Sequence, residues 1–237
     1  MRVAPMLVLA VLTMASTVSA RQEVEVVACG QVVPRSALGF LTADLDCPGA
    51  DPFGSAVVLD TNAILDLRGF ALTTEKNIGV YCARGKPGQR QLQGCTVMNG
   101  SIHASGFGVS GMRVRASDLV VTVSAERGAD GIFSGSVLRG RNLRVSGAPI
   151  CGVSARSARL ESSTITDNLR VGVCGRARLI DSAVVGNCTD PDGDYAFLGP
   201  CADILSGRRP VLVDSTCGSS LGHASPTNPD WDLCSDD

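Results

Sequence analysis

A repeated glycine followed by a β-branched residue is the feature that most limits what this chain can fold into. The pattern begins with "IGV" at 78–80 and ends with "VGV" at 171–173. The five repeated glycines are Gly79, Gly108, Gly131, Gly152 and Gly172. Their spacings of 29, 23, 21 and 20 residues are typical of solenoid repeats. One such repeat cannot bury its own apolar side chains, so we expect neighbouring repeats to stack and share one core.

The residue after each repeated glycine predicts an inward-facing column. These residues are Val80, Val109, Ile132, Val153 and Val173. Because successive side chains of a strand point to opposite faces, we expect the glycines to face outward or to lie at a bend. A row of outward glycines would leave a strip without side chains, where a long polymer could lie. The alternative is that each glycine serves a bend that needs a positive φ.

The rest of the chain also favours an all-β fold. Short apolar segments alternate with Ser, Asn, Asp and Gly, which are turn formers. The parallel phrases "ARLESSTITDN" (158–168) and "ARLIDSAVVGN" (177–187) are examples. After residue 20, no segment of ten or more residues shows helical periodicity. The signature of leucine-rich repeats, which have similar periods, is missing.

Two longer phrases carry a resemblance to a known fold family. They are "AVVLDTNAILDLRGFALT" (56–73) and "ADILSGRRPVLVDSTCG" (202–218). With the glycine repeat, they resemble the secreted right-handed parallel β-helix repeat proteins of the pectate-lyase-like superfold. The resemblance implies a single-domain, all-β, right-handed parallel β-helix with disulfide-closed caps at both ends. The expected division is a signal peptide at 1–20, an N-terminal cap at 21–55, coils at 56–217 and a C-terminal capping flap at 218–237.

The first twenty residues have the layout of a signal peptide. Arg2 is the only charged residue before a largely apolar run at 6–15, and Val18, Ser19 and Ala20 suit a signal peptidase. The run is too short to span a bilayer as a helix, and no other stretch is long and apolar enough. We therefore expect a secreted or cell-envelope protein, periplasmic or extracellular, without a transmembrane segment after cleavage. A retained N-terminal anchor is the alternative.

All ten cysteines follow residue 20, which predicts a disulfide framework in a secretory setting. We expect sequence neighbours to pair, as Cys29–Cys47, Cys82–Cys95, Cys188–Cys201 and Cys217–Cys234. The pairing of Cys151 with Cys174 is left open. These two residues lie at −1 and +2 relative to the repeated glycine, which on a regular strand are opposite faces. Trp231 is expected to cover the apolar end of the solenoid, with a sugar-stacking platform as the alternative.

Arginine pairs provide the main candidate site. Residues 113–178 hold eleven arginines and five acids, a net charge of +6. Six of the arginines form R-x-R pairs: Arg113, Arg115, Arg139, Arg141, Arg176 and Arg178. If extended, each pair points to one outer face, and like charges on stacked strands repel. A bound carboxylate, sulfate or phosphate would relieve this repulsion. The alternative is that they are solvated turn residues.

The other candidate sites are weaker. Asp190, Asp192 and Asp194 recur at a spacing that can present oxygens to Ca²⁺. An EF-hand would need Gly at Tyr195 and Glu at Cys201, so an acidic, disulfide-closed turn is the alternative. The two histidines are expected to be solvated or to stabilise turns; they are His103 and His223. The carboxylates of the central repeats are scattered and indicate no pair of the kind that glycosidases use.

These observations predict a secreted β-helix protein that is a non-catalytic scaffold or a weak binder of anionic polysaccharide or envelope. A polysaccharide lyase or glycoside hydrolase is one alternative, because the fold permits it. A purely structural surface protein is another. We expect no cofactor apart from the possible Ca²⁺, and no nucleic acid partner. The sequence leaves the oligomeric state open.

Overall fold

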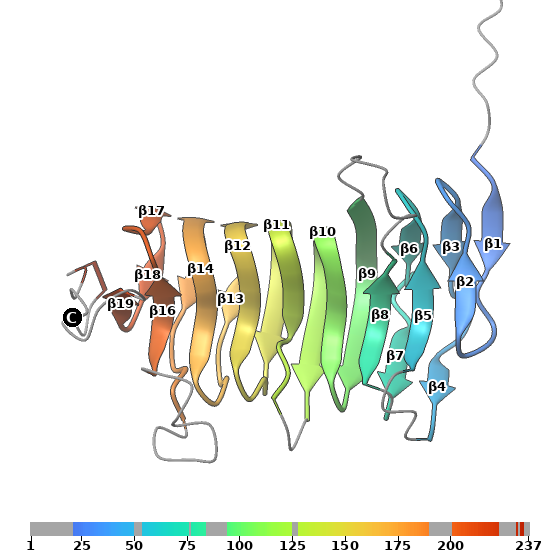
Figure 1. The fold of residues 1–237 in the computed structure, drawn as a ribbon, viewed down its shortest axis with the longest axis horizontal. Helices are drawn as coiled ribbons and strands as arrows, with labels where there is room; N and C mark the ends of the chain where they lie inside the picture. The colour runs from blue at the N-terminus through green and yellow to red at the C-terminus, as the bar shows by residue number, and fades with distance from the viewer. Residues whose placement is uncertain are drawn as a thin grey trace, which may run out of the picture.

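The chain is an all-β protein whose strands pair in parallel. The computed structural model describes residues 21–49, 54–75, 77–83, 94–124, 128–189, 201–222, 231 and 233–234. Within these ranges there are nineteen strands, no helix, and only parallel strand pairs. Figure 1 shows an elongated molecule in which strands follow one another from the N-terminal to the C-terminal end. Such an arrangement is consistent with a β-helix.

One row of strands contains the repeated glycines, and we call it the glycine row. It runs through β2 (Gln31–Val33), β5 (Ser55–Leu59), β8 (Ile78–Cys82), β10 (Phe107–Val123), β11 (Ile132–Ser146), β12 (Cys151–Glu161), β14 (Val171–Ile180), β16 (Ala202–Ser206) and β19 (Ser220–Gly222). The longest strands bend, so their later residues belong to other rows. In β10, for example, 107–111 lie in this row, 113–117 in the next and 119–123 in the last.

Two further rows complete the arrangement. The arginine row runs through β1 (Glu23–Glu25), β3 (Leu38–Phe40), β6 (Ile64–Asp66), β9 (Gly94–Ala104), β10, β11, β12, β14 and β17 (Val211–Val213). The third row runs through β4 (Leu45–Cys47), β7 (Ala71–Thr74), β9, β10, β11, β13 (Thr164–Ile165), β15 (Ala183–Val184) and β18 (Thr216–Cys217). Each passage through the three rows forms one rung.

The predicted inward column is confirmed. Val80, Val109, Ile132, Val153 and Val173 pair in register on successive strands, and each is fully buried. Ile204 of β16 continues the column at 0% exposure. The side chains of the other two rows join them in one continuous core. Stacking therefore supplies the burial that one rung alone cannot provide.

The prediction that the repeated glycines face outward or serve a bend is wrong. All five are buried, and none has a positive φ. A Cβ on Gly131 would lie 2.4 Å from the Val145 side chain, and one on Gly108 would lie 2.4 Å from that of Val121. These positions face the core, where the side chains of the third row leave no room for a Cβ. Glycine is the residue that fits there. A bare outer strip for a polymer is therefore excluded.

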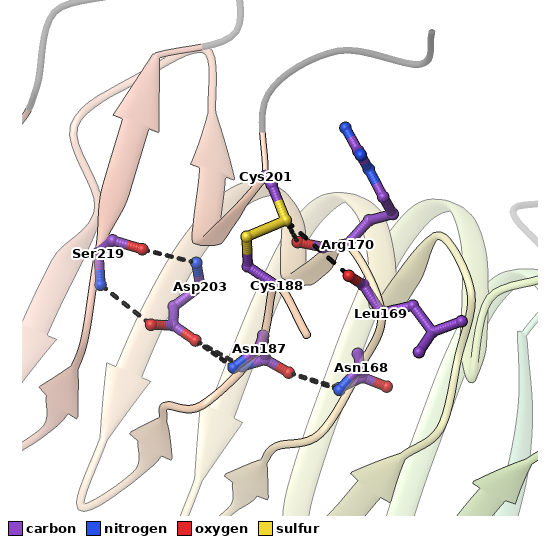
Figure 2. Close-up of a disulfide and its surroundings, with 8 residues drawn as sticks. All are labelled: Asn168, Leu169, Arg170, Asn187, Cys188, Cys201, Asp203 and Ser219. Carbon is purple, nitrogen blue, oxygen red and sulfur yellow. Dashed lines mark hydrogen bonds between the residues drawn. A yellow bond between two sulfur atoms is a disulfide. The ribbon is translucent and has the colours of Figure 1, made fainter. Parts of the chain in front are cut away.

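A buried polar ladder links three C-terminal rungs (Figure 2). Asn168 Nδ2 donates to Asn187 Oδ1 at 2.7 Å, and Asn187 Nδ2 donates to Asp203 Oδ1 at 2.7 Å. The Ser219 backbone N–H donates to Asp203 Oδ2 at 3.0 Å and closes the ladder. Asp203 occupies the position of β16 that is level with Gly172 of β14, and it is 4% exposed. The two amides also satisfy buried backbone groups. Asn168 Oδ1 accepts the Ala148 N–H, and Asn187 Nδ2 donates to the Ile165 carbonyl.

The structure contains the four predicted disulfides and pairs Cys151 with Cys174 as a fifth. That pair is possible because the strand does not alternate here. Gly152 and Val153 both point inward, so the residues at −1 and +2 share the outer face of the glycine row. There they form a small apolar cluster with Val171 and Leu205, apart from the main core. Five disulfides indicate a non-cytoplasmic compartment.

The two ends of the molecule carry disulfides. Cys47 of β4 and Cys217 of β18 lie on the first and last strands of the third row and bind Cys29 and Cys234. Trp231 lies next to the last strand of the glycine row, where its backbone N–H donates to the Ser220 carbonyl at 3.4 Å. Within the described ranges, no helix is long and apolar enough to cross a membrane.

Candidate functional site

Four arginines form an unbroken outward column on the arginine row. Arg115 of β10 pairs with Arg139 of β11, which pairs with Arg159 of β12, which pairs with Arg178 of β14. Thr96 precedes the column and Val211 follows it. All four arginines are exposed. Because neighbouring strands lie about 4.8 Å apart, the column is a regular line of positive charge roughly 14 Å long.

The predicted R-x-R pairs do not stack as pairs. Each contributes one member to the column: Arg115, Arg139 and Arg178. Arg113 and Arg176 belong to the outward column before it, where Val137 and Ser157 separate them. Arg141 belongs to the column after it, between Ser117 and Glu161. The three pairs thus share one face of the molecule. The first and third occupy the same two columns, and the Arg139–Arg141 pair is offset from them by two residues.

Arg159 falls in the same sector of the repeat as the R-x-R pairs, but it was not one of the six predicted anion-binding residues. A signal for it exists in the sequence, because Arg159 and Arg178 occupy the same place in the parallel phrases "ARLESSTITDN" and "ARLIDSAVVGN". The structure places both phrases on successive rungs, with Arg159 opposite Arg178. Aligning the two phrases would therefore have identified the fourth member of the column.

The column is largely unneutralised by the protein. Arg159 Nε donates to Glu161 Oε1 at 2.7 Å, and this is the one ion pair that the described residues contain on this face. Glu161 is itself more than one-third exposed, so solvent screens the pair. Arg115, Arg139 and Arg178 have no carboxylate within 4 Å among the described residues. Their mutual repulsion favours binding of an anion.

A hollow of about 450 Å³ lies over the first three arginines of the column, Arg115, Arg139 and Arg159. The charged side chains around it are those of Arg115, Arg139, Arg141, Arg159 and Glu161. Ser117 adds a hydroxyl group. Four guanidinium groups and one carboxylate therefore surround a space large enough for part of a polar chain. Planar guanidinium groups bind carboxylate, sulfate and phosphate through paired hydrogen bonds.

The central carboxylates lie at separate places. Asp118 and Asp167 occupy corners with φ of 52° and 54°, where a short polar side chain is favoured. Glu161 binds Arg159. Asp130 lies on the outer side of the glycine row, directly before Gly131. Glu126, the remaining carboxylate of the central repeats, lies outside the described residues.

Asp130 is nevertheless an unusual carboxyl group. It is 7% exposed, and its Oδ1 accepts the Cys151 backbone N–H at 3.1 Å. Burial raises the pKa of the Asp130 carboxyl from its ordinary value of 3.8 to about 6, against the opposing effect of hydrogen bonds from Cys151 and Ser154. The sequence indicated this residue only as a polar break in the apolar positions that precede the glycines.

Of the remaining predicted site residues, the structure describes only His103. Asp190, Asp192, Asp194 and His223 lie outside the described residues. His103 is exposed on β9, as expected for a neighbour of the inward Ile102. Among the described residues, no three His, Cys, Asp or Glu side chains are placed to hold a metal ion.

Comparison with family models, with curated proteins and with solved structures finds no match for this chain. The geometry of the arginine row is therefore what a functional interpretation depends on.

Proposed function

We propose that the chain is a secreted, right-handed parallel β-helix that binds linear anionic polysaccharide through its arginine column, without a catalytic step. The right hand follows from the strong preference of parallel crossovers for that hand. Secretion is supported by the disulfides and by the apolar run at 6–15. The anionic ligand could belong to the periplasm, the cell envelope or the extracellular space.

The observation that carries this proposal is the register of Arg115, Arg139, Arg159 and Arg178 on four consecutive strands. A rigid backbone holds these groups at a fixed spacing, so little backbone order is lost when a ligand binds. A linear polyanion lying along the long axis would meet one guanidinium group at each rung. A compact anion would reach only one or two of them. An extended ligand therefore uses the column best.

Removing alternate members of the column should weaken binding. We expect the variant Arg139→Ser plus Arg178→Ser to bind heparin or polygalacturonate on the order of tenfold less tightly, because exposed charge contacts contribute up to about 1 kcal/mol each. It should leave either resin at lower salt than the wild type, since surface attraction is screened over about 8–10 Å at physiological ionic strength. Retention and affinity would be measured on the purified chain.

The matched control is Arg144→Ser plus Arg208→Ser, two exposed arginines outside the column. It has the same net charge as the column variant and should keep most of the binding. Equal weakening of both variants would mean that overall charge, and not the column, retains the polymer. Release of reducing ends or unsaturated products from either polymer would show a hydrolase or lyase activity and would contradict a role in binding alone.

A further inference from the structure

A second hollow lies beside the arginine column, toward the N-terminal end of the molecule. Its volume is about 460 Å³, and its floor includes Ser36, Asn62 and Gly94. These three small residues lie on successive rungs: the Ser36 N–H donates to the Thr61 carbonyl, and the Asn62 N–H donates to the Gly94 carbonyl. Gly94 then pairs with Arg113. The hollow exists because Ser36, Asn62 and Gly94, which have short side chains or none, precede the long side chain of Arg113 in the same outward column.

Arginines line this hollow at several points. They are Arg21, Arg113 and Arg115. Arg113 follows Gly94 along the outward column, whereas Arg115 belongs to the neighbouring column, where it pairs with Thr96. Among the described residues that line the hollow there is no carboxylate. Three guanidinium groups therefore surround a space that no described carboxylate lines.

An unmet hydrogen-bond donor marks the same hollow. Arg113 Nε is buried and has no hydrogen-bond partner among the described residues. Buried donors are nearly always satisfied, so an unsatisfied one calls for an explanation. A ligand anion that draws the Arg113 guanidinium group toward itself would remove this cost. Such a ligand would also offset the charge that Arg21 and Arg115 place nearby.

We propose that this hollow binds a sulfate or phosphate monoester carried on a sugar-sized, hydroxylated group. A tetrahedral oxyanion presents three free oxygens in three directions and can meet three separate guanidinium groups, whereas a carboxylate presents two oxygens in one plane. Ser36, Asn62 and Thr96 offer hydroxyl and amide groups to the hydroxyls of the carrier. The site shares Arg115 with the column but does not depend on polymer binding there.

Gly94 allows a test that leaves every charge in place. A Cβ on Gly94 would have its nearest contacts with Arg113 at 3.6 and 3.7 Å, which are ordinary distances, and its φ is not positive. Alanine therefore fits at this position. A leucine would extend into the hollow and occupy the space of the ligand. The pair Gly94→Leu and Gly94→Ala separates blocking of the hollow from an effect on the backbone.

Binding would be measured by isothermal titration calorimetry at low ionic strength, with glucose 6-phosphate, glucose 6-sulfate, inorganic phosphate and glucose as probes. We expect both esters to bind more tightly than inorganic phosphate, and glucose to give no detectable heat. Gly94→Leu and Arg113→Ser should each weaken ester binding at least roughly tenfold, because the leucine occupies the space of the ligand and the serine removes a charge-assisted contact. Gly94→Ala should bind like the wild type.

Three results would overturn this assignment: no ester binding to the wild type, unchanged binding to Gly94→Leu, or equal affinity for inorganic phosphate and the esters. The last would indicate a free-anion site without a sugar subsite. The column variant Arg139→Ser plus Arg178→Ser should still bind the esters. Loss of polymer retention in that variant with retained ester binding would show that the two sites are separate.

Discussion

Replacing Asn187 with leucine should lower the free energy of unfolding by about 4 kcal/mol. Leucine fills a similar volume but cannot replace the amide. The Ile165 carbonyl, which accepts from Asn187 Nδ2 at 3.0 Å, would lose this partner. The Asn168 backbone N–H, which donates to Asn187 Oδ1 at 3.2 Å, would lose its own. Each buried group left unsatisfied costs about 1–3 kcal/mol, and the carboxyl of Asp203 loses a further donor.

Urea denaturation of the wild type and the variant measures this difference. Asn77→Leu is the matched control, because Asn77 is exposed at a bend before β8. A surface change of this kind is expected to shift stability by no more than about 0.5 kcal/mol. If Asn187→Leu were as mild as Asn77→Leu, the ladder would not stabilise the C-terminal rungs.

Replacing Asp130 with asparagine should stabilise the protein at pH 8 but not at pH 4. The folded-state pKa of Asp130 is raised from 3.8 to about 6, so the folded state binds its proton more tightly than the unfolded state does. That contribution is fully present below about pH 4 and is lost as the pH rises through 6. The shift of about two pH units corresponds to roughly 3 kcal/mol. Asparagine has no charge to bury and can still accept the Cys151 N–H.

The measurement compares the free energies of unfolding of the wild type and Asp130→Asn at pH 4 and pH 8. Taking the difference between the two proteins cancels the titration of the other carboxylates. We expect the variant to be about 2–3 kcal/mol more stable at pH 8, and within about 1 kcal/mol of the wild type at pH 4. A difference that does not change with pH would contradict burial as the cause of the raised pKa.

The sequence predicted the core of this molecule because its signal is repeated. Val80, Val109, Ile132, Val153 and Val173 are β-branched and recur every 20 to 29 residues, and stacked strands need such residues at equivalent inward positions. The disulfides between sequence neighbours were predictable for a different reason. They close short loops at caps or protrusions, with sequence separations of 13 to 18 residues.

The directions of some side chains could not be predicted, because strict alternation fails at the glycines. Gly152 and Val153 both point inward, which places Cys151 and Cys174 on the same outer face. The packing that forces this arrangement comes from Ile165 of the third row, whose Cγ2 would lie 2.8 Å from a Cβ on Gly152. Such contacts join residues of different rows, and one strand's own pattern does not contain them.

The arginine column was only partly predictable. The sequence showed that arginine is concentrated in residues 113–178 and would face outward. Which arginines align depends on the register between strands. The pairing of β10, β11, β12 and β14 shifts after residues 111, 134 and 154, just before the column begins. Spacing from the glycines alone therefore could not determine that Arg141 and Arg176 fall outside the column.

The most direct test of the arginine column is residue-specific nuclear magnetic resonance of the arginine Nε–H groups during titration with a heparin-derived tetrasaccharide. We expect the signals of Arg115, Arg139, Arg159 and Arg178 to shift together with one dissociation constant, while those of Arg68, Arg144 and Arg208 stay nearly constant. Equal shifts of all arginine signals, or shifts confined to arginines outside the column, would contradict this prediction.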